Sequence, residues 1–411
     1  MSRKPNDKPT VLITDAGRGS AIAFIRSLGR RGWRVIAADS DPHSLGFRSR
    51  YTWERLVYPS SESAPRGLVE TLLQAARDKH VDLLIPVTDD VILPLAEARA
   101  QFEGVCTLAM PEFDQLDVVT NKLKTLGLAE QVGVPAPRTL LIHTAEDSRA
   151  VGSALGWPVV LKPQASRLYR DQAGVDVLEV SYAENPDRLA EQMARFEGRC
   201  PVLLQEYYPG DGHGVELLMH QGKPLAAFQH KRLHEVPITG GASSYRVSVP
   251  LDPAMYGYSV RLLEALRWTG LAMVEFKVGA QGAKLMEING RIWGSMPLAV
   301  LSGMDFPGRL AELYLYGPPP EGTSLDTGYK TGVRARNLER DVVWIISVLI
   351  GRRRHSFLPA PGRAQALAAL PGFLNPMIRS DILSWDDPGP GLAEIPKIFV
   401  KLSSKRKKLK Q

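Results

Sequence analysis

Residues 271–291 read LAMVEFKVGAQGAKLMEINGR, and this stretch decides which fold we predict. Alternating apolar and polar residues predict two β-strands, 271–278 and 284–289, joined by a glycine-marked turn. A turn centred between these strands places Glu275 opposite Glu287. The stretch therefore predicts a β-hairpin on which two carboxylates face each other.

The two faces of this hairpin differ in chemistry, because successive side chains on a strand point to opposite faces. One face is expected to carry the ligand-facing side chains: Met273, Glu275, Lys277, Leu285, Glu287 and Asn289. The other face is apolar and is expected to pack on the core: Ala272, Val274, Phe276, Val278, Met286 and Ile288.

Two carboxylates directly opposite each other repel, which destabilises a hairpin. A cation between Glu275 and Glu287 would remove this repulsion, and Mg²⁺ prefers hard oxygen ligands. Arg291 follows directly and adds a guanidinium group that can bind an anion. A solvated polar face is the alternative interpretation. We interpret the combination as a magnesium–polyphosphate site.

The composition is that of an ordinary globular protein. At 411 residues, with 44% hydrophobic and 23% charged residues, the chain is expected to hold about two or three domains. Cys106 and Cys200 are its two cysteines, which excludes a disulfide framework and suits a reducing compartment. The first ten residues, MSRKPNDKPT, contain no apolar signal region, so we expect a cytoplasmic protein.

The net charge of +7 is concentrated in residues 401–411, which hold six Lys or Arg and no acidic residue. This segment is either a solvated, disordered tail or a contact for an anionic membrane surface or an acidic partner. Nucleic-acid binding is not expected, because the rest of the chain shows no basic patch with interleaved aromatic residues. A homodimer is the default expectation for the assembly.

Residues 342–350, VVWIISVLI, form the longest apolar run. Nine residues are too few to span a bilayer, which needs roughly 20. We predict a buried helix, with an interfacial helix as the alternative because three arginines follow closely.

The N-terminal residues predict a βαβ unit of a doubly wound sheet that continues to about residue 110. Gly17, Gly19 and Asp39 partly match a dinucleotide-binding fingerprint, but Ile22 occupies its third glycine position, which argues against NAD. Further along, residues 88–90 (TDD) follow a predicted strand, where they either face a ligand or cap the next helix.

A set of residues in a fixed order carries a resemblance to a known family. These residues are Lys122; Lys162 before a proline; Gln205, Glu206, Tyr207 and Tyr208; Glu216; Glu275; and Glu287, Asn289 and Arg291. In this set the chain resembles the ATP-grasp superfamily over roughly residues 9–320. The resemblance points to its carboxylate–amine ligases and its carbamoyl-phosphate-synthase-like branch.

The resemblance implies a fold of mixed α/β and α+β class. It implies a Rossmann-like pre-ATP-grasp domain at 9–110 and an ATP-grasp domain at 111–320. The latter would have a small lobe at about 135–207 and a large lobe at about 208–320. Residues 321–411 would form a C-terminal extension that ends in the basic tail.

The resemblance also implies roles in binding ATP and magnesium. Lys122 and Lys162 would contact the α- and β-phosphates, unless Lys122 is only a solvated helix residue. Residues 205–208 would form the interdomain hinge, and Gln205 or Glu206, with the backbone, would read the adenine edge. The remaining nucleotide contacts would be Glu216 on the ribose, with Met273 and Leu285 on the adenine ring; core filling is the alternative for the last two.

Two magnesium ions, replaceable by Mn²⁺, would lie between Glu275, Glu287 and Asn289, and Arg291 would stabilise the transferred phosphoryl group. Glu287→Ala is expected to abolish turnover and to leave the fold intact, because it relieves the repulsion between the facing carboxylates. The loop after Lys162 departs from the family pattern: it has one glycine, Gly174, and it contains Arg167 and Arg170. These arginines would either replace backbone contacts to phosphate or recognise an anionic second substrate.

The implied reaction joins a small-molecule carboxylate to an amine through an acyl phosphate. Residues 231–246 are the candidate acceptor site, in which Lys231, Arg232 and Arg246 would hold carboxylates; a surface hairpin is the alternative. His213 and His234 are candidate bases, although an isolated histidine is more often structural. Other readings are a thioester ligase, carboxylase or phosphotransferase, an oxidoreductase, and a catalytically silent nucleotide-binding scaffold in a membrane-associated pathway.

Overall fold

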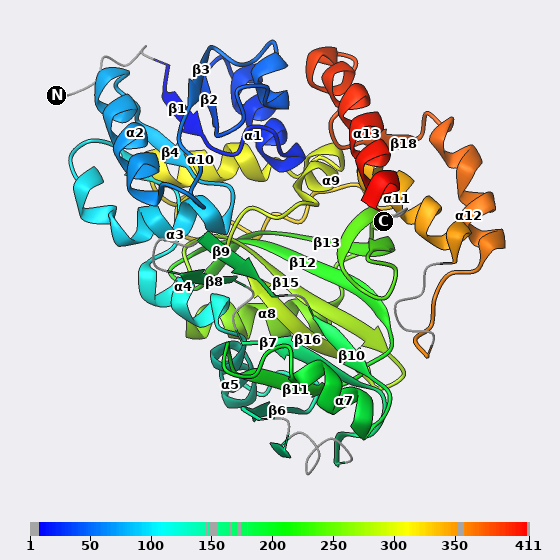
Figure 1. The fold of residues 1–411 in the computed structure, drawn as a ribbon. Helices are drawn as coiled ribbons and strands as arrows, with labels where there is room; N and C mark the ends of the chain where they lie inside the picture. The colour runs from blue at the N-terminus through cyan, green and yellow to red at the C-terminus, as the bar shows by residue number, and fades with distance from the viewer. Residues whose placement is uncertain are drawn as a thin grey trace.

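The N-terminal region folds as an open parallel sheet (Figure 1). The computed structural model describes residues 8–144, 146–147, 154–164, 167–170, 174–178, 180–351 and 357–408. The sheet has the order β3-β2-β1-β4-β5, with β1 (Thr10–Ile13), β2 (Arg34–Asp39), β3 (Glu54–Val57), β4 (Leu83–Ile85) and β5 (Thr107–Leu108). Its helical elements are α1 (Gly19–Arg30), η1 (Leu45–Arg48), α2 (Pro65–Asp78), α3 (Asp89–Glu97) and η2 (Arg99–Phe102).

Both faces of this sheet are covered, as parallel sheets require. Val11 and Ile13 pack in the same core as α1, whereas Leu12 packs in a second core with α2 and α3. The alternation follows the period of the strand. The doubly wound fold predicted from the sequence is therefore confirmed.

A smaller four-stranded sheet forms the small lobe. Helices α4 (Phe113–Thr120) and α5 (Lys122–Gln131) lead to it. The sheet has the order β10-β7-β11-β6, with β6 (Thr139–Ile142), β7 (Val159–Pro163), β10 (Ser181–Ala183) and β11 (Val202–Glu206), and α7 (Pro186–Met193) packs on it. A separate antiparallel ribbon consists of β8 (Arg167–Arg170) and β9 (Gly174–Val177). The side chains of Arg167 and Arg170, and residues 165–166 and 171–173, lie outside the described part of the chain.

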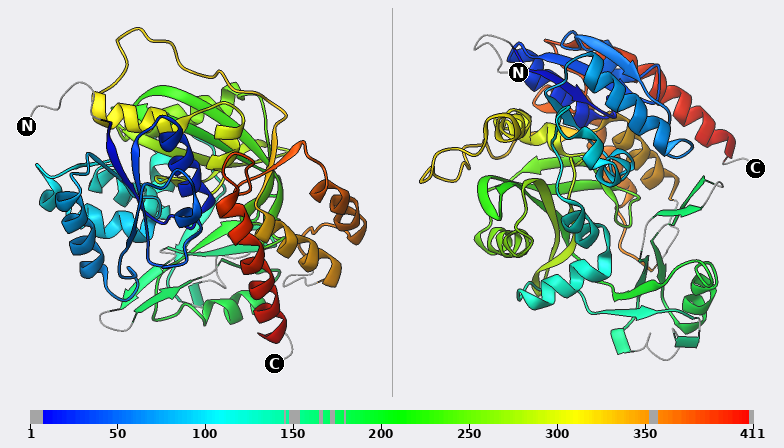
Figure 2. Two further views of the ribbon diagram at one scale, coloured as in Figure 1. Left: turned by 90° about the horizontal axis from the view of Figure 1, so that it is seen from above. Right: turned by 90° about the vertical axis from the view of Figure 1, so that its left-hand side faces the viewer.

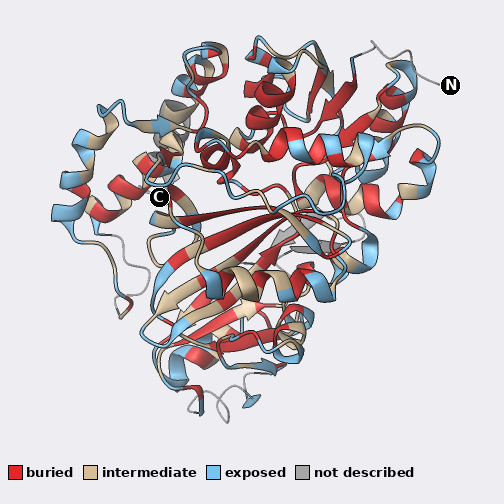
Figure 3. Cartoon of the chain, turned by 180° about the vertical axis from the view of Figure 1, so that it is seen from behind, coloured by how far each residue is buried: buried red, intermediate tan, exposed pale blue. Residues whose placement is uncertain are grey.

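A seven-stranded sheet forms the large lobe, in the order β16-β15-β12-β13-β14-β17-β18. Its strands are β12 (Asp211–His220), β13 (Lys223–Val236), β14 (Ala242–Ser248), β15 (Gly270–Gly279), β16 (Gly282–Asn289), β17 (Arg334–Arg336) and β18 (Ile378–Ser380). Helix α8 (Pro253–Ala265) packs in one core with alternate residues of β12 and β15. Figure 3 shows that the central strands of this sheet are largely buried.

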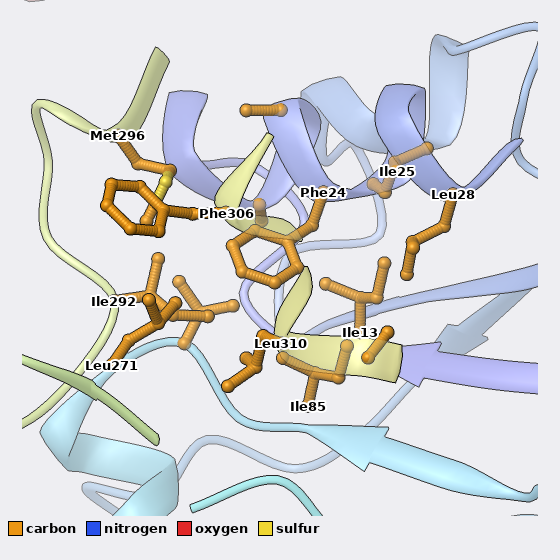
Figure 4. Close-up of a cluster of buried hydrophobic side chains, with 14 of the residues drawn as sticks. Ile13, Phe24, Ile25, Leu28, Ile85, Leu271, Ile292, Met296, Phe306 and Leu310 are labelled. Carbon is orange, nitrogen blue, oxygen red and sulfur yellow. The ribbon is translucent and has the colours of Figure 1, made fainter. Parts of the chain in front are cut away.

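The large lobe and the N-terminal sheet share a hydrophobic core. Phe306 and Leu310 of α10 (Phe306–Tyr316) cluster with Ile13, Ile85 and Phe24 (Figure 4). Helix α9 (Met296–Leu301) contributes to the same core. The core therefore extends across the domain boundary that the sequence predicts near residue 110. The boundary itself stays a prediction.

The C-terminal residues are integrated into the molecule. β17 and β18 complete the large sheet, and α11 (Leu338–Ile350), α12 (Arg363–Ala369) and η3 (Leu370–Phe373) pack beside it. Helix α13 (Pro388–Lys408) lies against the N-terminal domain (Figure 2). Because α13 continues to Lys408, the disordered-tail interpretation is wrong for residues 401–408.

The apolar run 342–350 lies within α11, as predicted. Trp344, Ile345 and Val348 are buried, whereas Ile346 and Ile350 are exposed. Within the described ranges, no helix combines the length and apolar character needed to cross a membrane.

Candidate active site

The hairpin of β15 and β16 places Glu275 opposite Glu287, as the sequence predicts. A β-bulge follows this pair, so that Leu285, and not Met286, lies opposite Phe276. Leu285 is consequently buried in the core with Phe276, and Met286 lines the cleft. The predicted contact of Leu285 with adenine is therefore wrong, because one extra residue in a strand exchanges its faces.

A cleft of about 880 Å³ lies above the ligand-facing side of this hairpin. The small lobe, the large sheet, the N-terminal domain and the C-terminal segments all line it. The predicted site residues among its walls are Lys122, Lys162, Gln205, Glu206, Tyr207, Tyr208, Arg232, Arg246, Met273, Glu275, Glu287, Asn289 and Arg291. Folding thus gathers most of the predicted site residues in one cavity.

The carboxylate pair is held by a network of donors. Asn289 Nδ2 donates to Glu275 Oε1 at 3.0 Å and to Glu287 Oε1 at 3.2 Å. Arg232 Nη2 lies 2.5 Å from Glu275 Oε2. Desolvation raises the pKa of Glu275, the negative charge of Glu287 adds to this shift, and the Arg232 guanidinium opposes it.

Glu287 differs from Glu275 because two lysines surround it. Desolvation opposes ionisation of Glu287, but the cations of Lys162 and Lys122 outweigh this effect and lower its pKa. Glu287 is therefore a counter-charge for the lysines as well as a neighbour of Glu275. Removing it would relieve the repulsion from Glu275 and create a repulsion between the two lysines, so relief of the carboxylate repulsion does not by itself predict an intact Glu287→Ala fold.

The two lysines reach the cleft from different elements. Lys122 begins α5, where Asn121 caps the helix by accepting from the backbone N–H groups of Leu123 and Lys124. Lys162 lies on β7 of the small lobe. Desolvation lowers the pKa of Lys162 to about 8, against the opposing charge of Glu287, and it also lowers the pKa of Lys122. An anion such as phosphate would stabilise both charged forms.

The donor set around the hairpin fits a metal that takes most of its ligands from phosphate and water. Within the described ranges, no group of three His, Cys, Asp or Glu side chains could hold a metal ion. Glu275, Glu287 and Asn289 supply two carboxylates and one amide, and Mg²⁺ commonly uses one or two carboxylates together with substrate phosphates. The residues present thus suit magnesium bound with a nucleotide.

The segment after β11 lines the cleft at the junction of the two lobes. Gln205 Nε2 donates to Thr139 Oγ1 at 2.8 Å. The carboxylate of Glu206 accepts from Arg138 Nε at 2.8 Å and from Lys284 Nζ at 2.6 Å. Both polar side chains are thus engaged with protein groups, which leaves the neighbouring backbone as the better candidate for contacts to a base.

Arg291 links the large lobe to the N-terminal domain. Its Nε donates to Asp89 Oδ2 at 2.8 Å, and Asp89 begins α3 at the end of the parallel sheet. Thr88 makes no side-chain cap to that helix and instead donates to Asp15 Oδ1 at 3.0 Å. Of the two alternatives for residues 88–90, the structure favours a position facing the cleft over a capping role.

Glu216 does not line the cleft, contrary to its predicted ribose contact. It is fully buried, accepts from Ser295 Oγ at 3.0 Å, and lies 3.0 Å from His230 Nδ1. Burial raises the pKa of Glu216 to about 8 and lowers that of His230 well below its ordinary value. The carboxyl group therefore belongs to the protein core, where burial favours its protonated, neutral form.

The predicted acceptor segment separates into two parts. Lys231 does not line the cleft and pairs with Asp211 at 2.6 Å, so the structure does not support its predicted role. Arg232 and Arg246 do line the cleft. Neither candidate base belongs to it: His234 stacks on Trp344, and His213 contacts Gln229.

Residues that sequence reasoning missed complete the cleft. They come from the N-terminal turn and from the C-terminal region: Arg18, Gly19, Ser20, Asn337, Arg340, Asp381 and Lys397. The glycine-containing turn was a visible signal for the first three. The C-terminal residues carry no motif, and only the folding of α11, β18 and α13 around the cleft reveals them.

The comparisons with known proteins agree with this geometry. Residues 199–339 match a family described as ATP-grasp in the biosynthetic pathway with Ter operon. The large chain of carbamoyl phosphate synthase from Thermotoga neapolitana is 21% identical over 355 residues, which cover 78% of this chain and 31% of that protein. These matches place residues 199–339 in the ATP-grasp superfamily.

Solved structures share the fold of this chain. A biotin carboxylase complex from Campylobacter jejuni has a TM-score of 0.61 and 17% identity, covering 80% of this chain and 74% of that one. An L-amino acid ligase from Bacillus licheniformis has a TM-score of 0.59 and 16% identity, covering 76% and 75%. The mixed α/β fold predicted from the sequence is thus confirmed.

Much of the chain lies outside the family match. The match ends at Glu339, before most of α11 and all of α12 and α13. The chain also spans less than a third of the carbamoyl phosphate synthase large chain. The side of the cleft that is formed by Arg340, Asp381 and Lys397 is therefore a feature that the match does not describe.

Proposed function

We propose that the protein is an ATP-dependent carboxylate–amine ligase that releases ADP and phosphate. The observation that carries this proposal is the carboxylate pair Glu275 and Glu287, facing each other in a cleft whose other wall supplies Lys122 and Lys162. Such a set suits transfer of a phosphoryl group by positioning and charge neutralisation.

We place the nucleotide at the small-lobe end of the cleft. The adenine ring would lie near Met273, Met286 and the backbone of residues 206–208. Its phosphates would reach Lys122 and Lys162, and magnesium would join them to Glu275, Glu287 and Asn289. The ion would neutralise charge on the phosphates as the terminal group is transferred.

The reaction we propose has two steps. A carboxylate oxygen of the first substrate attacks the γ-phosphorus of ATP, and ADP leaves with the electron pair of the broken P–O bond. The nitrogen of the amine then attacks the acyl carbon, phosphate leaves, and the amine loses a proton. Arg291 is placed to stabilise the transferred group, and its ion pair with Asp89 holds the guanidinium in position.

Magnesium-dependent ADP release tests the proposal. Purified protein is assayed with pooled carboxylates crossed with pooled amines, and products are identified by mass spectrometry. The proposal predicts ADP release stimulated by one pair, an amide of that pair, and loss of both in Glu287→Gln. If ADP release is accompanied instead by a thioester, a carboxylated product or a phosphorylated product, the acceptor is a thiol, or the compound that becomes carboxylated or phosphorylated, and not an amine. Absence of ATP binding would contradict the proposal.

A further inference from the structure

Four segments that are distant in the sequence meet at the end of the cleft opposite the small lobe. They are the turn before α1, the start of α11, the residues after β18, and the middle of α13. Arg246 Nη2 lies 2.5 Å from Asp381 Oδ1, and a Cβ atom added to Gly19 would lie 3.4 Å from the Cβ of Asp381. Figures 1 and 2 show α1 and α13 side by side above the large sheet.

Two guanidinium groups in this junction, those of Arg18 and Arg340, differ from the other arginines of the cleft, each of which pairs with a carboxylate. Arg232 pairs with Glu275, Arg291 pairs with Asp89, and Arg246 pairs with Asp381.

Within the part of the chain that the structure describes, the side chains of Arg18 and Arg340 make no hydrogen bond or ion pair, although both line the cleft. Nearby carboxylates are already engaged: Asp41 pairs with Lys397, and Asp39 accepts from the Gly17 N–H and from Ser44 Oγ.

The positive charges of this junction act on one another. Desolvation lowers the pKa of Arg340, and the charges of Arg18 and Arg246 lower it further, while Glu339 and Asp381 partly offset them. Helix α1 begins here with no side-chain cap and no acidic residue in its first turn, so its positive end adds to the cations. An anion at this position would relieve the repulsion, as a cation would between Glu275 and Glu287.

We propose that Arg18 and Arg340 bind an anionic group, a carboxylate or a phosphate, that the amine substrate carries in addition to its reacting nitrogen. The inference rests on the proposed ligase function and names the class of its second substrate. Because the nucleotide would fill the small-lobe end, the amine approaches from the side of α1 and α11. Guanidinium groups match the planar or tetrahedral oxygens of such an anion with paired donors.

Titration calorimetry with simple anions tests this site. Protein saturated with Mg²⁺ and a non-hydrolysable ATP analogue is titrated with succinate and, separately, with inorganic phosphate. The probe that binds distinguishes a carboxylate site from a phosphate site. Arg18→Gln and Arg340→Gln are each expected to weaken its binding about tenfold or more and to leave the affinity for the analogue unchanged.

Arg66→Gln is the matched control, because Arg66 is exposed on α2 and does not line the cleft. Thermal melting verifies that each variant is folded. Wild-type affinity for the probe in both cleft variants, or binding of neither probe to the wild type, would overturn the proposal. If the ATP analogue fails to bind, the proposed function fails, and the same titrations on nucleotide-free protein still decide the anion site.

Discussion

At the scale of single residues, the local environment decides what an acidic side chain does in this protein. Glu275, Glu287 and Glu216 all lie on strands of one sheet. Cations surround the first two: Lys162 and Lys122 lower the pKa of Glu287, and the Arg232 guanidinium opposes the rise that burial causes in the pKa of Glu275. Glu216 instead lies between Ser295 and the neutral His230, where burial favours a protonated carboxyl group.

The position of Glu216 predicts a pH-dependent stability. Its pKa in the folded protein is about 8, against an ordinary value of 4.5, so the folded state keeps a proton that the unfolded state releases. The free energy of unfolding should therefore fall as pH rises from about 4.5 to about 8, by up to about 1.4 kcal/mol per pH unit. Glu216→Gln removes this titration and should gain stability relative to the wild type over that interval.

Urea unfolding at pH 5, 6.5 and 8 measures the effect, with the exposed Glu103→Gln as the control. A difference between Glu216→Gln and the wild type that stays constant with pH would show that the buried carboxyl group is ionised throughout.

The sequence could predict the pair Glu275 and Glu287 because their register depends only on a short turn between neighbouring strands. It could not predict the surroundings of Glu216. Ser295 is 79 residues away in the chain, and no local pattern joins the two.

At the scale of elements, the β-bulge in the hairpin decides which side chains face the cleft. Period-2 alternation holds from Met273 to Glu275 and then shifts on the returning strand. The sequence does not indicate this bulge, because Leu285 and Met286 are both apolar and either could face the core. The assignment of faces could therefore be predicted for β15 but not for the first half of β16.

This assignment predicts opposite effects of two neighbouring substitutions. Leu285→Ala should destabilise the protein by about 2–5 kcal/mol, because it opens a cavity among Phe276, Ile288 and their neighbours. Met286→Ala should change stability little and weaken ATP binding about fivefold to tenfold, because it removes apolar surface from the cleft. Chemical denaturation and calorimetry of each variant measure the two effects. The reverse pattern would show that the strand carries no bulge.

At the scale of the whole molecule, the C-terminal region closes the cleft by binding to the N-terminal domain. Arg26 Nε donates to Asp387 Oδ2 at 2.9 Å, and Ser49 Oγ donates to the same oxygen at 2.8 Å. Asp387 also accepts from the Arg50 N–H at 2.8 Å. The sequence predicts only an appended extension here, because contacts between residues more than 300 positions apart produce no periodic pattern in it.

The ion pair between Arg26 and Asp387 predicts a large loss of stability when it is broken. Both groups are buried, so Asp387→Ala should lower the free energy of unfolding by about 3–5 kcal/mol by leaving the Arg26 cation without its partner. Asp386→Ala is the matched control, because Asp386 pairs with Arg30 at the surface and should cost less than about 1 kcal/mol. Equal losses in the two variants, measured by urea unfolding, would contradict the anchoring role.

The proposed ligase function depends most on a magnesium–nucleotide site at Glu275 and Glu287. Calorimetric titration with ATP, with and without Mg²⁺, tests it directly in the wild type, in Glu287→Gln and in the control Arg66→Gln. We predict that Mg²⁺ tightens ATP binding at least about tenfold in the wild type and in the control, and not in Glu287→Gln. Equal tightening in Glu287→Gln and the wild type would contradict the assignment of this carboxylate pair.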